Sequence, residues 1–141
     1  MTTTTGIQPV ALNAADVMST PVMTITPTAS LWEAWRLMMG SGLRHLVVSY
    51  DDEVLGVIDD RAVFAQWPMG PLALRRTHVA DVMRPRTSCV LANVDVRLVA
   101  EVMIADATDA VPVVDDLGQV IGIVTASDLT CAVAAHGLCR G

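Results

Sequence analysis

The chain has 141 residues, enough for one compact domain, and a formal net charge of −6 from fifteen acidic residues, nine arginines and no lysine. An acidic chain without a basic stripe argues against binding to nucleic acid or to anionic membranes. Hydrophobic residues make up 52% of the chain, yet no apolar run reaches the roughly 18 residues that span a bilayer. The excess apolar surface predicts buried strands and a homodimer, and the exclusive use of arginine points weakly to a bacterial source.

Cysteine and histidine usage predicts a cytoplasmic protein without disulfides or metal. The cysteines are odd in number and lack CxxC spacing, and residues 1–5 carry no secretory pattern. The cysteines are Cys89, Cys131 and Cys139, and the histidines are His45, His78 and His136. No recognisable ligand spacing links these histidines, so we expect no metal site.

The first half of the chain predicts a strand, a helix, two strands and a helix. After a flexible tail at 1–14, residues 22–26 have β character. Ser30 and Glu33 form a capping-box pattern ahead of an apolar stripe at helical spacing, and Gly40 and Gly42 end this helix. The stripe consists of Leu31, Ala34, Trp35 and Met38. Strands are expected at 45–48 and 53–58 around a tight turn, and a short helix at 60–66.

The second half repeats the first. The sequence Ala-Asp-Val-Met occurs at 15–18 and again at 80–83, 65 residues later, whereas the runs 54–58 and 120–124 are 66 residues apart. One residue should therefore be gained or lost between Met38 and His45. A helix after Asp95, strands at 111–114 and 119–124, and a helix at 127–137 complete the repeat.

We therefore predict an α+β (α/β) fold of two pseudo-symmetric β-α-β-β-α modules packed into one domain. The boundaries are a tail at 1–14, module 1 at 15–67, a linker at 68–79, module 2 at 80–137 and a tail at 138–141. Residues 67–71, which contain Pro68 and Pro71, should form neither a helix nor a central strand. Small ligands often bind in clefts between such modules.

The end of the second repeat carries the strongest candidate for ligand chemistry. Thr125 and Asp128 stand three residues apart where a strand passes into a helix. A carboxylate there can accept both hydroxyls of a ribose, and free N–H groups at the helix start suit a phosphate. The same Thr-x-x-Asp pattern is an ordinary capping box, and on residues 122–129 alone this structural reading is favoured.

The Asp-Val-Met openings, the run 111–115 and the terminus 122–129 together resemble a tandem pair of CBS domains, or Bateman module, over about residues 15–135. The resemblance implies a regulatory module that binds adenine nucleotides or related adenosyl ligands. It implies that Asp128 holds the ribose and that Thr125, with Ser127 beside it, lies near the phosphates. The adenine would lie near Thr87, Cys89, Val111 and Pro112.

Module 1 departs from this pattern. Asp59 stands where module 2 has Thr125, and Ala62 stands where it has Asp128. Ala62 accepts no hydrogen bond and Asp59 would repel a phosphate, so we expect one competent cleft at most, built around module 2.

Four basic residues near the clefts have open roles. Arg84 and Arg86 precede the first strand of module 2 and are either phosphate ligands overhanging its cleft or solvated linker residues. Arg44 and His45 open a strand beside the cleft of module 1, where a histidine is more often structural than a ligand.

The leading hypothesis is a non-catalytic regulatory protein that senses AMP, ADP, ATP or S-adenosylmethionine, requires no cofactor and modulates an unknown partner protein. No nucleophile and base stand at a spacing that suggests catalysis. Trp32, Trp35 and the apolar last helix are assigned to dimerisation. The alternatives are a ligand-free dimeric scaffold with degenerate sites and, more weakly, an enzyme or redox sensor that uses Cys89.

Overall fold

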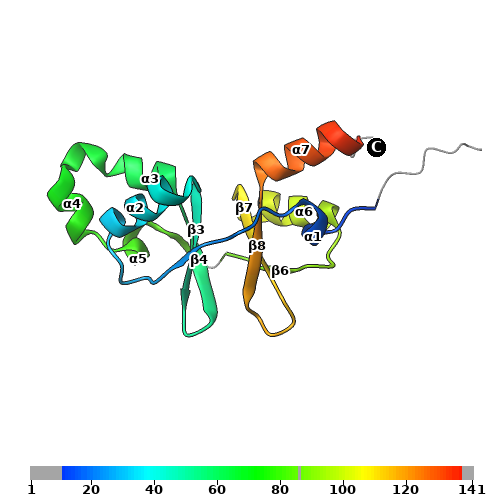
Figure 1. Cartoon of the computed structure of the whole chain (residues 1–141), viewed down its shortest axis with the longest axis horizontal. Helices are drawn as coiled ribbons and strands as arrows, with labels where there is room; N and C mark the ends of the chain where they lie inside the picture. Colours follow the sequence, from blue (N-terminus) through cyan, green and yellow to red (C-terminus); the bar gives the residue numbers. More distant parts are fainter. Residues whose placement is uncertain (1–10, 86, 138–141) are drawn as a thin grey trace, which may run out of the picture.

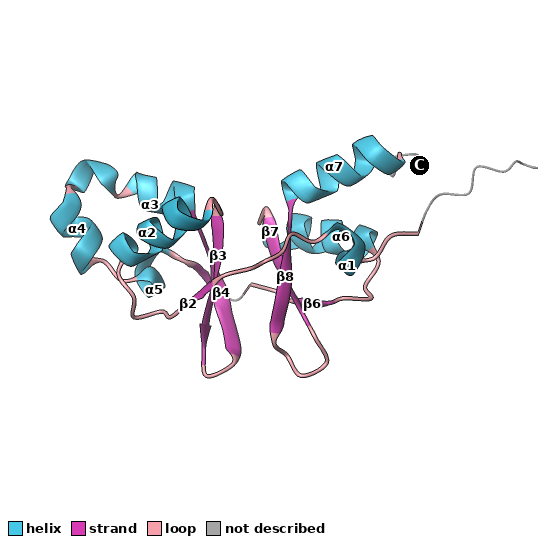
Figure 2. Cartoon of the chain, in the orientation of Figure 1, coloured by secondary structure: helices cyan, strands magenta, loops and turns pink. Residues whose placement is uncertain are grey.

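The computed structural model describes residues 11–85 and 87–137. It consists of two halves that stand side by side, each with a small sheet on the inside and helices on the outside (Figure 2). The α+β fold and the paired repeat are confirmed. The predictions for Arg86, for Cys139 and for most of both tails fall outside the described residues.

The first half has a four-stranded sheet in the order β2-β3-β4-β5. Helices lie along its outer side (Figure 1). Only the β2–β3 pair is parallel. Its elements are β2 (Thr24–Ile25), α2 (Leu31–Ser41), β3 (His45–Tyr50), β4 (Glu53–Asp59), α3 (Asp60–Ala65), the 3-10 helix η1 (Trp67–Met69), α4 (Pro71–Arg76), α5 (Val79–Val82) and β5 (Arg84–Pro85).

The second half has a three-stranded sheet in the order β6-β7-β8. Its elements are β6 (Val90–Leu91), α6 (Val96–Asp106), β7 (Ala110–Val114), β8 (Val120–Thr125) and α7 (Ala126–His136). The faces of the two sheets meet in an apolar cluster in which Val47 and Val57 of the first half contact Ala110 and Ile123 of the second. This cluster fixes the orientation of the two halves around the clefts.

Helix α2 follows its sequence signals closely. The Ser30 hydroxyl oxygen accepts a hydrogen bond of 3.1 Å from the Glu33 N–H, and Gly42 ends the helix in the left-handed region. Leu31 and Met38 of the predicted stripe are buried. The Ser30 cap and the apolar stripe therefore position the core of the first half as expected.

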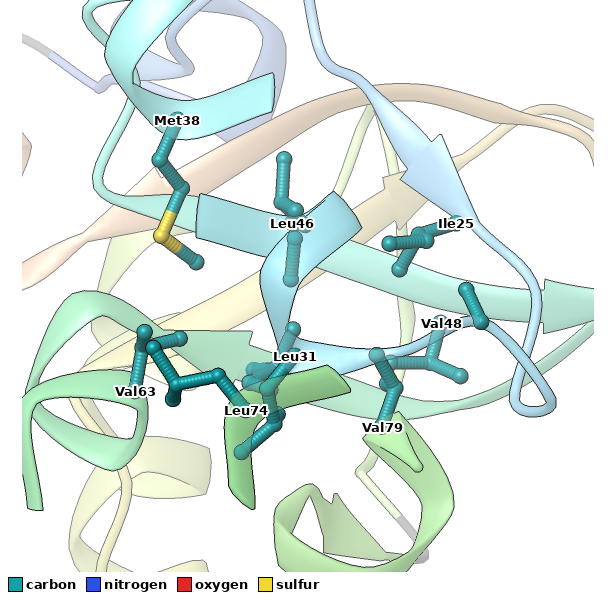
Figure 3. Close-up of a cluster of buried hydrophobic side chains, with 11 residues drawn as sticks. Ile25, Leu31, Met38, Leu46, Val48, Val63, Leu74 and Val79 are labelled. Atoms are coloured by element: carbon teal, nitrogen blue, oxygen red, sulfur yellow. The ribbon is translucent and has the colours of Figure 1, made fainter. Parts of the chain in front are cut away.

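Each opening Asp-Val-Met segment packs against the other half. Helix α1 (Ala14–Val17) contacts α6, α7 and β8, and Ala14 is completely buried in the core of the second half. Val79 of α5 lies in the core of the first half, beside Leu74 and Leu31 (Figure 3). The two openings are therefore exchanged between the halves: each packs against the half that does not follow it in sequence.

The strand register locates the extra residue of the repeat. Val48 pairs with Gly56 in the first hairpin and Val113 pairs with Gly122 in the second. The first members of these pairs are 65 positions apart and the second members 66, so the additional residue lies in the second hairpin turn. Our placement of it between Met38 and His45 is wrong, because the turn and not the helix end absorbs the insertion.

The expected linker is mostly helical. Pro68 and Pro71 lie in the first turns of η1 and α4, where a proline loses no intrahelical hydrogen bond. The Trp67 ring packs against Trp35, tilted by 47° with 5.5 Å between ring centroids, and the Arg75 guanidinium carbon lies 4.9 Å from the Trp32 ring centroid. The expectation of no helix at 67–71 is wrong, and the helical linker covers part of the aromatic surface that we assigned to dimerisation.

Among residues 11–85 and 87–137, none of the helices combines the length and apolar character that crossing a membrane requires.

Candidate functional site

Two cavities lie between the halves, and they are built alike. Three segments line each cavity. They are the start of α3 or α7, the residues that end or follow the Asp-Val-Met opening that packs on the hairpin before that helix, and the residues that precede β7 or β3 in the other half. The exchange of openings therefore creates both cavities. We call them the Asp128 cavity and the Asp109 cavity.

The Asp128 cavity has a volume of about 270 Å³. It is lined by Ser19, Pro21, Val22, Gly42, Leu43, Arg44, His45, Ile123, Thr125, Ser127 and Asp128. Ser19 is held against β8 by two backbone hydrogen bonds with Ile123, of 2.8 and 3.2 Å. The predicted Thr125, Ser127 and Asp128 are thus brought together at one cavity.

The Asp128 carboxylate is engaged on both oxygens. Oδ2 accepts hydrogen bonds from the Thr125 N–H at 2.8 Å and from the Thr125 hydroxyl at 3.1 Å, which completes the capping box of α7. Oδ1 accepts one hydrogen bond of 2.7 Å from the Ser19 hydroxyl. Because a carboxylate oxygen has two lone pairs, Oδ1 retains one acceptor position.

Arg44 supplies the positive charge of this cavity. Its carbonyl oxygen accepts a 3.0 Å hydrogen bond from the Asp60 N–H at the start of α3, which fixes its backbone in the first half. Its exposed side chain nevertheless lines the cavity of the second half. Sequence reasoning had placed Arg44 beside the cleft of module 1, because the chain alone does not show that this segment faces the opposite helix.

The Asp109 cavity is larger, about 550 Å³, and lies at the end of the first hairpin. It is lined by His45, Val57, Ile58, Asp59, Arg61, Ala62, Val82, Met83, Arg84, Pro85, Thr108 and Asp109. Its volume falls within the usual range for small-ligand sites, of roughly 300–1,000 Å³, whereas the Asp128 cavity is slightly smaller. Volume therefore favours the Asp109 cavity as a ligand site, whereas Asp128, the residue that the sequence predicts to bind ribose, lies in the smaller cavity.

Charged groups of the Asp109 cavity form one network. Arg61 Nη2 contacts the Asp59 carboxylate at 2.9 Å and the Asp109 carboxylate at 2.6 Å, and His45 Nε2 lies 3.4 Å from Asp109 Oδ1. The hydrogen bond to Asp59, reinforced by the charge of Asp109, raises the pKa of the Arg61 guanidinium above its ordinary value. Arg61 is therefore held as a cation between two carboxylates.

The remaining predicted site residues do not join Asp128. Arg84 lies at the Asp109 cavity, because β5 pairs with β4 of the first half. The structure therefore places Arg84 at the Asp109 cavity and not at the Asp128 cavity, where phosphate binding was one of its two open roles. Thr87 lines a neighbouring depression of about 240 Å³ together with Arg84 and Thr108.

The residues expected to contact adenine do not form one surface. Val111 is completely buried in the core of the second half, and Pro112 is buried beside it in β7. Cys89 is exposed, with its Sγ 4.0 Å from the Thr87 carbonyl oxygen. The protein atoms around Cys89 still desolvate its thiol enough to raise the pKa, which is the opposite of the shift expected for a reactive cysteine.

Sequence reasoning missed Ser19 and Arg44 as residues of the Asp128 cavity and Asp109 as a residue of the other. Ser19 follows the Ala-Asp-Val-Met opening directly, but its partner Asp128 is 109 residues away. The repeat itself held a signal, because Ser19 and Arg84 occupy the same position after the two openings.

Comparison with known proteins establishes the family. The family model described as CBS domain matches residues 14–66 and 79–135, so the chain belongs to the CBS domain family as a tandem pair, or Bateman module. Inosine-5′-monophosphate dehydrogenase of Methanocaldococcus jannaschii is 30% identical over 117 residues, which are 82% of this chain and 22% of the enzyme. Homoserine O-acetyltransferase of Methanosalsum zhilinae is 24% identical, over 89% of this chain and 25% of the enzyme. The chain thus spans a quarter or less of both relatives.

Solved structures share the fold. The CBS domain pair of protein MJ0100, in complex with 5′-methylthioadenosine and S-adenosyl-L-methionine, matches with a TM-score of 0.75 and 24% identity over 89% of this chain and 98% of that one. CBSX2 in complex with AMP matches with a TM-score of 0.69 and 23% identity over 88% and 97%. At these identities the likeness establishes the architecture of a CBS pair.

Proposed function

We propose that the chain is a non-catalytic regulatory module that binds an adenosine-containing ligand in the Asp128 cavity and thereby modulates a partner protein. The observation that carries this proposal is the convergence of Asp128, Ser127 and Arg44 on one cavity between the two halves. The adenosyl ligands named for MJ0100 and CBSX2 support the ligand class.

The ribose would bind at Asp128 Oδ1. One lone pair of this oxygen is available beside the Ser19 hydroxyl, and a second becomes available if that hydroxyl turns away. Oδ2 is fully used by Thr125, so Thr125 acts mainly by holding the carboxylate in place. Its hydroxyl therefore has a smaller direct role at the phosphates than the sequence alone suggests.

The anionic part of the ligand would lie between Arg44 and the start of α7. The Ser127 N–H is one of the first-turn donors that have no partner inside the helix, and the helix dipole favours negative charge there. Arg44 adds a full positive charge from the other half. A ligand held in this way contacts both halves and shifts the equilibrium between their relative positions, typically by about 1–3 kcal/mol.

The alternative is a dimeric interaction scaffold that binds no nucleotide. It is favoured by the fact that both Asp128 oxygens already serve the protein itself, through the α7 cap and Ser19. The exposed residues Cys131, Ala134 and Ala135 on α7 would supply part of the dimer surface.

The first prediction concerns the melting temperature of the protein in the presence of AMP, ADP, ATP, S-adenosylmethionine, NAD and GTP. A ligand at 100 times its dissociation constant adds about 2.7 kcal/mol, or about 5–10 °C at this chain length. We expect one adenosyl ligand to raise the melting temperature of the wild-type protein. Asp128→Asn should abolish the shift, and Arg44→Gln should reduce it more for AMP, ADP or ATP than for S-adenosylmethionine, which carries no phosphate.

Asp81→Asn is the matched control, because Asp81 caps α5 through the same type of bond, a 3.1 Å hydrogen bond from the His78 N–H. It should lower the baseline stability but keep the ligand-induced shift. A flat response of the wild-type protein at millimolar ligand would exclude the sensor function and leave the scaffold.

A further inference from the structure

The Asp109 cavity brings together three groups that commonly ligate metal ions. The Nε2 or Nδ1 atom of His45 and one carboxylate oxygen each of Asp59 and Asp109 lie within 4.8 Å of one another. All three side chains are half-buried, and they come from the start of β3, the end of β4 and the segment before β7. Two halves of the molecule thus contribute to one cluster at a cavity of about 550 Å³.

Backbone contacts hold two of these groups in place. Asp59 Oδ1 accepts a 2.9 Å hydrogen bond from the Ala62 N–H as the cap of α3, which leaves Oδ2 directed at the cluster. The Asp109 carbonyl oxygen accepts a 2.9 Å hydrogen bond from the Ala126 N–H at the start of α7. Such outer contacts orient ligands in metal sites.

A cation already occupies the space between the carboxylates. Arg61 contacts both of them, but its side chain is 70% exposed and extends from the first turn of α3, so it can move into solvent. The 3.4 Å between His45 Nε2 and Asp109 Oδ1 is long for a hydrogen bond. The cluster therefore has two carboxylates bridged by the exposed Arg61 side chain and an imidazole that contacts Asp109 only weakly. An incoming metal ion has to displace Arg61 from both carboxylates.

We propose that His45, Asp59 and Asp109 form a binding site for a divalent first-row transition metal ion, which displaces Arg61. An imidazole with carboxylates suits Zn²⁺ and Co²⁺, and Mg²⁺ prefers oxygen ligands alone. The cavity leaves the remaining coordination positions open to water or to an anion. This proposal reverses our sequence-based expectation of no metal site, since the ligands are 14 and 50 residues apart along the chain and have no motif spacing.

The test is a titration of the chelator-treated protein with Co²⁺, followed by the visible spectrum and by the metal content after dialysis. We expect one ion per chain and a spectrum without thiolate charge-transfer bands, because the ligands are nitrogen and oxygen. His45→Gln and Asp109→Asn should each weaken Co²⁺ binding about tenfold or more. Arg61→Gln should strengthen it, because the competing cation is removed.

Two controls match the ligand variants. Asp60→Asn removes the carboxylate next to Asp59, and His78→Gln removes a histidine outside the cluster; neither should change the affinity. Circular dichroism establishes that each variant is folded. His45→Gln and Asp109→Asn test the Co²⁺ site independently of each other. Failure to retain stoichiometric Co²⁺, thiolate bands in the spectrum, or unchanged affinity in a folded ligand variant would each overturn the proposal.

Discussion

Asp59 and Thr125 occupy the same position in the two halves and perform the same structural task. Asp59 accepts a hydrogen bond from the Ala62 N–H at 2.9 Å, and Thr125 accepts one from the Asp128 N–H at 3.3 Å. Each caps the helix that follows its hairpin. The substitution therefore preserves the helix cap while it replaces a neutral hydroxyl with a carboxylate, so the two cavities present different chemical groups.

Cys89 should react slowly at neutral pH. Desolvation raises the pKa of its thiol, so the thiolate, which is the reactive species, is scarcer at pH 7 than for an ordinary cysteine. In the double variant Cys131→Ser, Cys139→Ser, we expect the rate of iodoacetamide alkylation, followed by mass spectrometry, to be below that of glutathione. The rate should still rise above about pH 9. A rate that levels off near pH 7 would instead support the redox-sensor hypothesis.

At the scale of elements, one glycine in each β-hairpin permits the exchanged opening to approach. A Cβ atom on Gly56 of β4 would collide with the backbone carbonyl of Arg84, and one on Gly122 of β8 would collide with the Met18 side chain. Both glycines have φ outside the left-handed region, so the close approach and not the backbone conformation requires them. These two contacts bring the openings onto the hairpins and so form one wall of each cavity.

The two glycines should respond differently to the same substitution. Gly56→Ala pushes against backbone that β5 pairing holds in place, whereas Gly122→Ala pushes against a flexible methionine. Overpacking typically costs about 1–3 kcal/mol. We expect Gly56→Ala to lie at or above the top of that range and Gly122→Ala near the bottom, measured as the free energy of unfolding in urea. Equal losses would contradict the difference between backbone and side-chain contacts.

Local signals explain which elements the sequence predicted. Helix α2 was predicted because its signals, from the Ser30 cap to the Gly42 end, all lie within one continuous segment of the chain. Helix α4 was missed because two prolines suggested a break, although a proline in the first turn of a helix is compatible with it. At the candidate site, Thr125 and Asp128 were predicted together because they share one helix start. Arg44, Ser19 and Asp109 reach their cavities only through contacts between the halves, which no local pattern records.

At the scale of the whole molecule, the two halves depend on each other for their cores. Ala14 completes the core of the second half, and Val79 completes the core of the first. Both residues are completely buried. A destabilising substitution in an opening should therefore loosen the half against which the opening packs, and not the half that follows it in sequence.

Hydrogen exchange tests this dependence. Ala14→Asp buries an unpaired charge at a cost of about 3–5 kcal/mol. We expect faster exchange in β7 and β8, with smaller changes in β3 and β4. Val79→Asp is the reciprocal variant and should accelerate exchange in β3 and β4 first. A larger increase in exchange in β3 and β4 than in β7 and β8 on Ala14→Asp would show that each opening supports its own repeat.

The exchange of openings also determines how the halves can move. The chain crosses from the second half to the first between Met18 and Thr24, and crosses back between Pro85 and Val90. Two covalent connections, or tethers, therefore join the halves. The two tethers and the apolar cluster of Val47, Val57, Ala110 and Ile123 together restrict rotation of one half against the other. Because both halves line both cavities, any change in the relative position of the halves would alter the two cavities together.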